Sequence, residues 1–193
     1  MRKIVVSEFM TLDGVFEDPG GSEKTEHGGW NFKYWSDDVG PYKFDELRAA
    51  DALLLGRVTY EGFAASWPTM TELGEFADRM NGYPKYVVST TLQDAQWNNS
   101  HIIRDQVAEE VTRLKQQPGQ DILVYGSGQL VETLRQHDLV DEYRLMVHPV
   151  VLGSGKRLFP EASTKVSDLK LTGSQAFAGG IVVLTLVPAA TAA

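Results

Sequence analysis

Short apolar runs, rich in β-branched residues, alternate with segments of helical spacing along most of this chain, and this alternation constrains the fold more than any other feature. The apolar runs predict strands at residues 4–9, 52–55, 86–89, 102–103 and 122–125. The segments between them predict helices at residues 42–50, 60–67, 73–80, 106–116 and 129–137. Strands that alternate with helices usually pair in parallel, so the pattern predicts an α/β fold with a mostly parallel central sheet.

The pattern changes after His137. Apolar runs at residues 140–151, 165–174 and 181–187 are joined by turns that carry Gly and Pro instead of by helices, which predicts antiparallel strands at the carboxyl-terminal end of the sheet. Of the 193 residues, 42% are hydrophobic, enough for one substantial core. With neither an internal repeat nor a break in composition, the sequence predicts a single domain over residues 1–193.

Composition excludes several classes of function. The chain contains no cysteine, which rules out disulfides, cysteine nucleophiles and thiolate zinc sites. Its net charge is −8 without any basic run, so we expect neither nucleic acid nor a membrane as a partner. The four histidines lack ligand spacing, and no metal is expected. No apolar run reaches the roughly 18 residues of a membrane span, and the first residues become charged too early for a signal peptide, so a cytoplasmic location is expected.

A strand-to-helix break at Gly56 is the first candidate ligand site. The run 53–55 passes through Gly56 and Arg57 into a helix start that carries Thr59. Gly56 allows a ligand to approach the backbone, Thr59 can cap the helix, and Arg57 can hold a phosphate with its forked guanidinium group. An ordinary turn with a surface arginine explains these residues equally well.

A second break of the same kind follows the strand 121–125. The segment 126–129, Gly-Ser-Gly-Gln, leads into a helix that begins near Leu130. The full dinucleotide-binding fingerprint is absent, because Val131 occupies the position of its third glycine. Two such breaks in one chain are nevertheless more informative than one, since a dinucleotide pyrophosphate can lie between two helix starts. We therefore favour a nucleotide site over two unrelated turns.

The segment 13–38 is too long and too rich in Gly, Asp and Glu for a simple connection, and it contains Trp30 and Trp35. Such a segment is typical of a functional loop or lid. Ser89 and Thr90 follow another predicted strand, where hydroxyl groups could reach a ribose or a 2′-phosphate, although a polar turn explains them as well.

Several short motifs follow one another in the order found in a known family. They are Thr11-Leu12-Asp13-Gly14, Leu55-Gly56-Arg57-Val58-Thr59-Tyr60-Glu61, Val124-Tyr125-Gly126-Ser127-Gly128-Gln129-Leu130, Val140-Asp141-Glu142-Tyr143 and Pro149-Val150-Val151-Leu152-Gly153-Ser154-Gly155. Together they resemble the riboflavin-biosynthesis reductase domain family, which shares the dihydrofolate reductase fold, over residues 4–187. The resemblance implies a three-layer α-β-α fold with NADPH bound across the carboxyl edge of the strands.

The resemblance also implies roles for single residues. The phosphates of NADPH would be lined on one side by Gly56, Arg57, Thr59 and Tyr60, and on the other, toward the nicotinamide, by Gly126, Ser127, Gly128, Gln129 and Leu130. Ser89 and Thr90 would contact the adenosine ribose, and Asp13 and Gly14 would belong to a loop that closes over nicotinamide and substrate. In such proteins a hydride passes to an electron-poor carbon of a small planar heterocycle or carbonyl compound, and the protein supplies positioning and a proton.

The sequence leaves the proton donor open. In dihydrofolate reductase the acid precedes, by about one helical turn, an aromatic residue that Phe44 resembles. Gly40 and Pro41 occupy that turn here. The candidate catalytic acids are therefore Asp37 and Asp38 just upstream, with Asp13 from the loop as the alternative, while Asp45 and Glu46 lie just downstream.

The natural substrate is also open. Folate enzymes hold the glutamate tail of folate with a proline–arginine pair, whereas this chain has Pro84 and Lys85 at that place. The zinc deaminase half of the bifunctional riboflavin enzymes needs cysteines, which are absent from this chain. The alternatives are a riboflavin-pathway reductase, a dihydrofolate reductase, or a catalytically silent nucleotide-binding protein of the same fold. A homodimer through the carboxyl-terminal strands is a further expectation. The aromatic residues that could stack on a flat substrate ring are Trp30, Trp35, Phe44 and Trp67.

Overall fold

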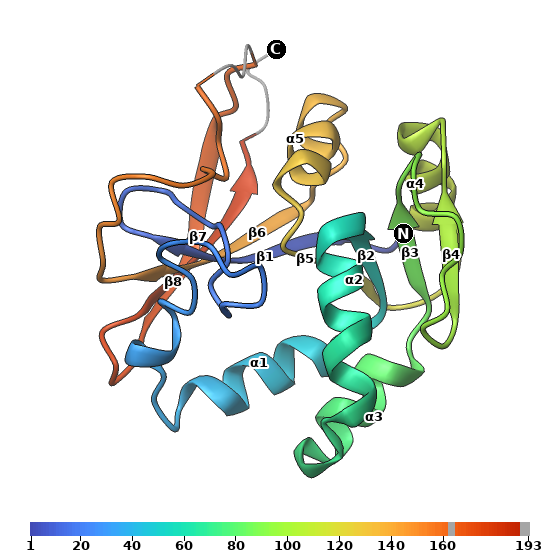
Figure 1. Cartoon of the computed structure of the whole chain (residues 1–193). Helices are drawn as coiled ribbons and strands as arrows, with labels where there is room; N and C mark the ends of the chain where they lie inside the picture. The colour runs from blue at the N-terminus through green and yellow to red at the C-terminus, as the bar shows by residue number, and fades with distance from the viewer. Residues whose placement is uncertain (162–164, 190–193) are drawn as a thin grey trace.

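A computed structural model describes residues 1–161 and 165–189, which form an eight-stranded sheet with helices on both faces (Figure 1). The strands are β1 (Ile4–Thr11), β2 (Ala50–Gly56), β3 (Lys85–Val88), β4 (Ser100–Ile103), β5 (Asp121–Tyr125), β6 (Glu142–His148), β7 (Leu169–Ala176) and β8 (Val182–Pro188). The α-helices are α1 (Val39–Arg48), α2 (Arg57–Ser66), α3 (Glu75–Gly82), α4 (Val107–Gln116) and α5 (Gly128–Gln136), and short 3-10 helices lie at Phe32–Tyr34, Trp67–Thr69 and Thr71–Leu73.

The strands are ordered β4-β3-β2-β5-β1-β6-β8-β7 across the sheet. The first six in this order pair in parallel, while β8 pairs antiparallel with both β6 and β7. The structure thus confirms the predicted mostly parallel sheet with antiparallel carboxyl-terminal strands. In the described part of the chain, no helix is long and apolar enough to cross a membrane.

Element boundaries differ from the sequence expectation at several points. Helix α1 begins at Val39 rather than at residue 42, because Pro41 falls in its first turn, where the missing N–H of proline costs no helical hydrogen bond. Strand β2 begins at Ala50, two residues early, and β7 begins at Leu169, four residues late.

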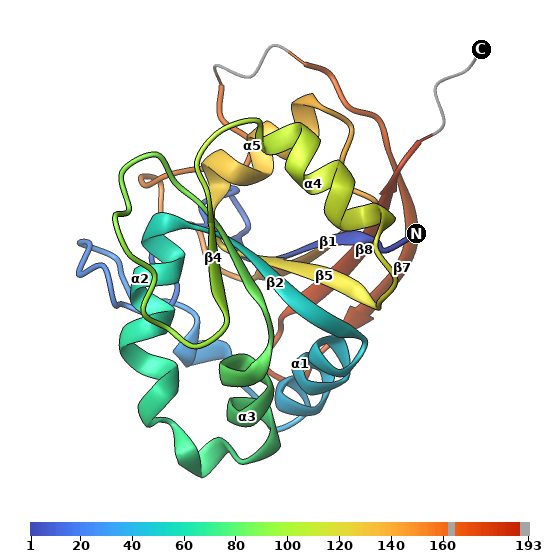
Figure 2. The ribbon, with the colours of Figure 1, turned by 90° about the vertical axis from the view of Figure 1, so that its right-hand side faces the viewer.

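Helices cover both faces of the sheet (Figure 2), and each face carries its own hydrophobic core. On one face, buried side chains of α4 and α5, such as Val111 and Leu134, pack on Ile4 of β1. On the other face, Leu47 of α1 packs on Val5 together with residues of α2 and α3. The result is three layers, in which β1 is covered on both sides.

The carboxyl ends of the central parallel strands lie at one edge of the sheet, because β1 pairs with both β5 and β6 and β2 pairs with both β3 and β5. Ser7 of β1 lies opposite Tyr125 of β5, and Gly56 of β2 lies opposite Val88 of β3. In open parallel sheets, ligands bind outside this edge. The topology therefore directs the search for a site to the segments that follow β1, β2 and β5.

The strand pair β7–β8 extends the sheet beyond the helices, and most β7 side chains are partly or fully exposed. A register shift lies between Leu171 and Gly173, where β7 pairs with β8.

Lys85 at the start of β3 is fully buried. Its Nζ donates to the carbonyl oxygens of Asn81 at 2.6 Å and Asn98 at 2.9 Å, and it lies 4.1 Å from the centre of the Trp97 ring. Burial lowers the pKa of Lys85 from 10.5 to about 8. These bonds fix the start of β3 to the end of α3.

Lys85→Met is expected to change how stability depends on pH. Between pH 8 and 10 the unfolded chain keeps the Lys85 proton while the folded chain loses it, so wild-type stability should rise relative to the variant by about 1 to 3 kcal/mol. Urea unfolding of both proteins at pH 7, 8, 9 and 10 measures this difference. Parallel curves for the two proteins would show that Lys85 titrates normally in the folded state.

Candidate functional site

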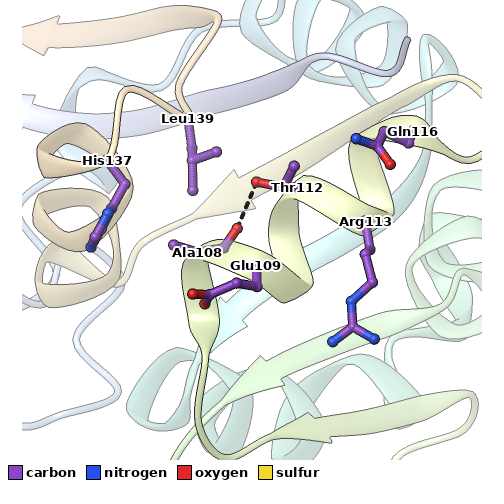
Figure 3. A pocket seen from close by; sticks show the side chains of 7 residues that line it. All are labelled: Ala108, Glu109, Thr112, Arg113, Gln116, His137 and Leu139. Atoms are coloured by element: carbon purple, nitrogen blue, oxygen red, sulfur yellow. Dashed lines mark hydrogen bonds between the residues drawn. The ribbon is translucent and has the colours of Figure 1, made fainter.

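A cleft of about 860 Å³ opens at the carboxyl edge of the sheet. It is bordered by the end of β1, the β1–α1 loop, helices α1 and α2, residues 67–80 and the turn after β5. A smaller depression of about 400 Å³ lies between α4 and the end of α5, where the charged side chains of Glu109 and Arg113 extend in different directions (Figure 3). Only the larger cleft is at the edge where parallel sheets bind ligands, so it is the candidate site.

The two predicted strand-to-helix breaks meet beside this cleft. The backbone N–H of Gly56 donates to Ser127 Oγ at 2.7 Å, and Ser127 Oγ in turn donates to Thr59 Oγ1 at 3.1 Å. A Cβ atom at Gly126 would lie 2.6 Å from Thr59 Oγ1, and one at Gly56 would lie 3.0 Å from Ser127 Oγ. Neither glycine can carry a side chain without displacing the other turn, so these four residues form one unit, hereafter the cradle.

Backbone conformation supports the same conclusion. Gly126 and Ser127 have φ of 57° and 74°, in the left-handed region that non-glycine residues rarely adopt. Ser127 precedes α5 and Gly56 precedes α2, and neither helix start has a side-chain cap hydrogen bond among the described residues. Two uncapped helix starts therefore present free N–H groups and positive dipole ends in one place, which suits phosphate groups.

The remaining predicted cofactor residues are spread more widely. Arg57 is exposed beside the cradle, and its Nη1 pairs with Glu61 at 2.8 Å. Gly128 lies against Phe16, since a Cβ there would be 2.4 Å from the ring. Gln129 is exposed on α5.

Other predicted contacts lie in the core or in turns. Tyr60 is 3% exposed and its hydroxyl accepts the N–H of Trp97, while Leu130 packs in the core under α5. Ser89 Oγ accepts the backbone N–H groups of Thr91 and Leu92, and Thr90 is exposed. Gly14 has φ of 83° in the turn after β1. The structure therefore groups Gly56, Thr59, Gly126 and Ser127 tightly and leaves Tyr60 and Leu130 facing away from the cleft.

None of the candidate catalytic acids Asp13, Asp37 and Asp38 lines the cleft, whereas Asp45, one of the two acids just downstream, does. Asp13 accepts the hydroxyl of Thr11 at 2.6 Å and the N–H of Gly153 at 2.9 Å, and these bonds lower its pKa. Asp38 is exposed, and the hydroxyl of Ser36 lowers its pKa. Asp37 is exposed. Acids with a lowered pKa, such as Asp13 and Asp38, are poor proton donors, and Asp37 lies outside the cleft lining, so the geometry does not favour the catalytic role predicted for them.

A buried ionic cluster lies beneath the cleft, around Glu46, the other of the two downstream acids. Lys43 of α1 forms an ion pair with Glu46 and donates to Ser7 Oγ at 2.8 Å. Glu46 also accepts the hydroxyl of Tyr125 at 3.1 Å and lies 3.6 Å from Arg144 Nη1. Burial, followed by the charge of Glu46, raises the pKa of Tyr125 well above its usual value. The cluster ties α1 to β1, β5 and β6 under the floor of the cleft.

A second buried acid, Glu8, lines the cleft next to this cluster. The backbone N–H of Gly126 acts on its carboxyl group and lowers its pKa, against the larger effect of burial. Each of these acids had a signal in the sequence. For Glu8 it was the polar pair Ser7-Glu8 within an otherwise apolar strand, and for Glu46 it was the spacing of Lys43 and Glu46 on one helix face.

The outer part of the cleft is apolar and aromatic. Trp67 stacks on Phe76 with ring centres 5.4 Å apart, and Phe63 packs edge-to-face on Trp67 at 6.1 Å. Of the four aromatic residues expected to stack on a substrate, Trp35, Phe44 and Trp67 line the cleft. Trp30 does not line it: its Nε1 donates to Glu17 O and its ring packs on His148.

Comparison with known proteins agrees with this geometry. Residues 2–183 match the model of the RibD C-terminal domain. The chain belongs to the RibD C-terminal domain family. The uncharacterized protein YyaP of Bacillus subtilis (strain 168), 33% identical over 187 residues, is matched over 94% of this chain and 92% of its own length. A second uncharacterized Bacillus subtilis protein, YwjB, is 30% identical over 176 residues, with 91% of this chain and 92% of YwjB covered.

Two solved structures share the fold of this RibD C-terminal domain protein. A protein named for riboflavin biosynthesis from Shewanella sp. PV-4 superposes with a TM-score of 0.74 at 18% identity, covering 97% of this chain and 99% of that one. Dihydrofolate reductase from Enterococcus faecalis, complexed with NADP(H) and RAB-propyl, superposes with a TM-score of 0.61 at 16% identity, with 96% of each chain covered. The expected dihydrofolate reductase-like three-layer fold is confirmed.

The ionic cluster makes Glu46→Gln strongly destabilising. Removing the charge leaves Lys43 without its buried ionic partner, while Arg144 keeps its ion pair with Glu142, so the free energy of unfolding in urea should fall by about 3 to 5 kcal/mol. The double variant Lys43→Met/Glu46→Leu removes both charges and should lose less than Glu46→Gln alone. Equal losses for the two proteins would contradict a mutually compensating pair.

Proposed function

We propose that this chain is an NADPH-dependent reductase that transfers a hydride to a small planar heterocyclic or carbonyl compound. The observation that carries the proposal is the cradle, where two helix starts converge beside an apolar cleft. Membership of the RibD C-terminal domain family and the reductase-type fold support it.

The residues present fit a dinucleotide phosphate. Gly56 and Gly126 leave the backbone bare where a Cβ would fill the cradle, and the first turns of α2 and α5 offer N–H donors. Thr59 and Ser127 add hydroxyl groups, and exposed Arg57 can exchange its surface partner Glu61 for a 2′-phosphate, because an exposed pair contributes little energy. When bound, NADPH would supply the hydride.

The apolar wall of the cleft favours a flat, uncharged substrate. Aromatic rings of Phe63, Trp67 and Phe76 can stack on a planar ring and keep water out. Arg48 also lines this part of the cleft, but it is paired with Glu75 at 2.9 Å and stacks on the Phe44 ring at 3.9 Å. This pair is as exposed as Arg57–Glu61, so Arg48 can also exchange Glu75 for an anionic group of a substrate, and the cleft does not discriminate between dihydrofolate and a phosphoribosyl pyrimidine.

Two further expectations stay predictions. A cytoplasmic location is consistent with NADPH chemistry, and a homodimer could use the exposed side chains of β7 and β8.

Gly126→Ala tests the cradle directly. The new methyl group would displace Thr59, so affinity for NADPH, followed by tryptophan fluorescence, should fall about tenfold or more, a change of about 1.4 kcal/mol. Gly153→Ala is the matched control, because Gly153 also has a positive φ, 79°, but has no atom within 4 Å of its Cβ position. Equal affinity of wild type and Gly126→Ala would exclude the cradle, and failure of wild type to bind NADPH would exclude the reductase function.

Arg57→Ala tests the choice of nucleotide. If Arg57 holds the 2′-phosphate, the variant should bind NADPH about tenfold more weakly, a loss within the range of a charged hydrogen bond, and should bind NADH as wild type does. Titration of both proteins with both nucleotides provides the comparison. An equal loss for NADH and NADPH would place Arg57 on the pyrophosphate instead.

A further inference from the structure

The carboxyl group of Glu8 has a position that the fold alone does not explain. Glu8 is 3% exposed in the central strand β1 and lines the cleft. Among the described residues, no hydrogen-bond partner reaches its Oε1 atom. A buried polar atom without a partner costs about 1 to 3 kcal/mol, so an apolar residue would serve the fold better here. The position thus points to a role toward a bound molecule.

The surroundings of Glu8 favour its protonated form. Burial is the largest effect and raises the pKa of Glu8 well above 4.5. The charge of Lys43 and the N–H of Gly126 act in the opposite direction, and the charge of Glu46 raises the pKa further. The carboxyl group therefore keeps its proton well above the pH at which an exposed glutamate loses it.

We propose that Glu8 is the proton donor of the reduction, an inference that rests on the reductase function proposed above. Both Glu8 and Gly126, a member of the cradle, line the cleft, and the Gly126 N–H acts on the Glu8 carboxyl group. Glu8 is therefore at the junction between the nucleotide cradle and the space that receives a substrate.

The proton and electron balance of this role is simple. As the hydride from NADPH joins the electron-poor carbon, the π electron pair of the C=O or C=N bond moves to the oxygen or nitrogen. That atom takes the proton of Glu8, whose O–H bond breaks. The Gly126 N–H and the positive charge of Lys43 stabilise the resulting carboxylate, and solvent returns the proton. One hydride and one proton are consumed for each substrate molecule.

Asp18, the other acid buried in the cleft wall, has a structural role instead. Its Oδ1 accepts the N–H of Glu23 at 3.0 Å, and its Oδ2 accepts the N–H of Thr25 at 3.0 Å and the Thr25 hydroxyl at 3.1 Å. Although burial raises the pKa of Asp18, these bonds lower it below its usual value. Asp18 stays ionised and organises its own loop, so it cannot supply a proton.

Glu8→Gln keeps the shape of the protonated acid and removes its acidic proton. The matched control is Glu109→Gln, which changes an exposed glutamate on α4. The acceptor is isatin, an uncharged planar heterocyclic ketone that is reduced at one carbonyl carbon. NADPH oxidation by Glu8→Gln should be about 100-fold or more slower than by wild type, while NADPH affinity, measured by tryptophan fluorescence, stays within about twofold. Wild-type activity should fall as pH rises through the pKa of Glu8, and the residual activity of the variant should not follow that profile.

Stability gives a readout that needs neither nucleotide nor acceptor. As pH rises above 4.5, unfolded Glu8 loses its proton while folded Glu8 keeps it, so wild-type stability falls relative to Glu8→Gln. Glu8→Gln should therefore melt at a higher temperature than wild type at pH 8, and at the same temperature at pH 4. A variant whose melting temperature falls relative to wild type between pH 4 and pH 8 would show that Glu8 is ionised in the folded protein, which overturns the proposal.

The remaining outcomes separate the two proposals. If wild type oxidises NADPH with isatin and Glu8→Gln does so at the same rate, Glu8 is not the donor, although the protein is a reductase. If wild type does not bind NADPH, the reductase function fails, and the donor role fails with it.

Discussion

The centre of the sheet must accommodate two polar side chains, Ser7 and Glu8, in a strand covered by helices on both faces. Buried polar groups are tolerated only when they are partnered or neutral. Lys43 donates a hydrogen bond to Ser7 and pairs with Glu46, and Leu47 packs on Val5, so these contacts together hold α1 on the sheet. Burial raises the pKa of Glu8, which lines the cleft together with Gly126 of the turn after β5. Two neighbouring residues of β1 therefore shape the floor of the cleft.

The cradle shows how sheet order converts distant sequence motifs into one site. Gly56 and Ser127 are 71 positions apart, yet β2 and β5 are neighbours, and this brings their carboxyl ends within hydrogen-bond distance. The strained backbone of Ser127 persists because its hydroxyl group binds both Gly56 and Thr59. Local strain at one residue is thus balanced by contacts that also position the helix starts.

Sequence patterns were sufficient for the strands, the change to antiparallel pairing and the two glycine-bearing turns, because each of these depends on local spacing. Sequence patterns did not predict Glu8 as the acid of the site. Asp13 and Asp38 lie near the expected place along the chain, but their side chains are used by backbone N–H groups of distant loops, those of Gly153 and Ala178. Glu8 acquires its properties only from burial and from Lys43 on another element, which no spacing rule describes. Helix α1 also starts early, at Val39, because Pro41 is compatible with the first turn of a helix.

The attachment of Glu8 to a central strand has a consequence for how such proteins diversify. Strand β1 is held by hydrogen bonds to β5 and β6 on both sides, so an acid on it cannot shift independently of the turn at Gly126. The outer wall belongs to other elements, the helices and turns that carry Phe44, Phe63 and Trp67. Substitutions in that wall can alter which molecules are admitted while the alignment of acid and cradle is inherited unchanged. Substrate range and reaction chemistry can then evolve separately on one scaffold.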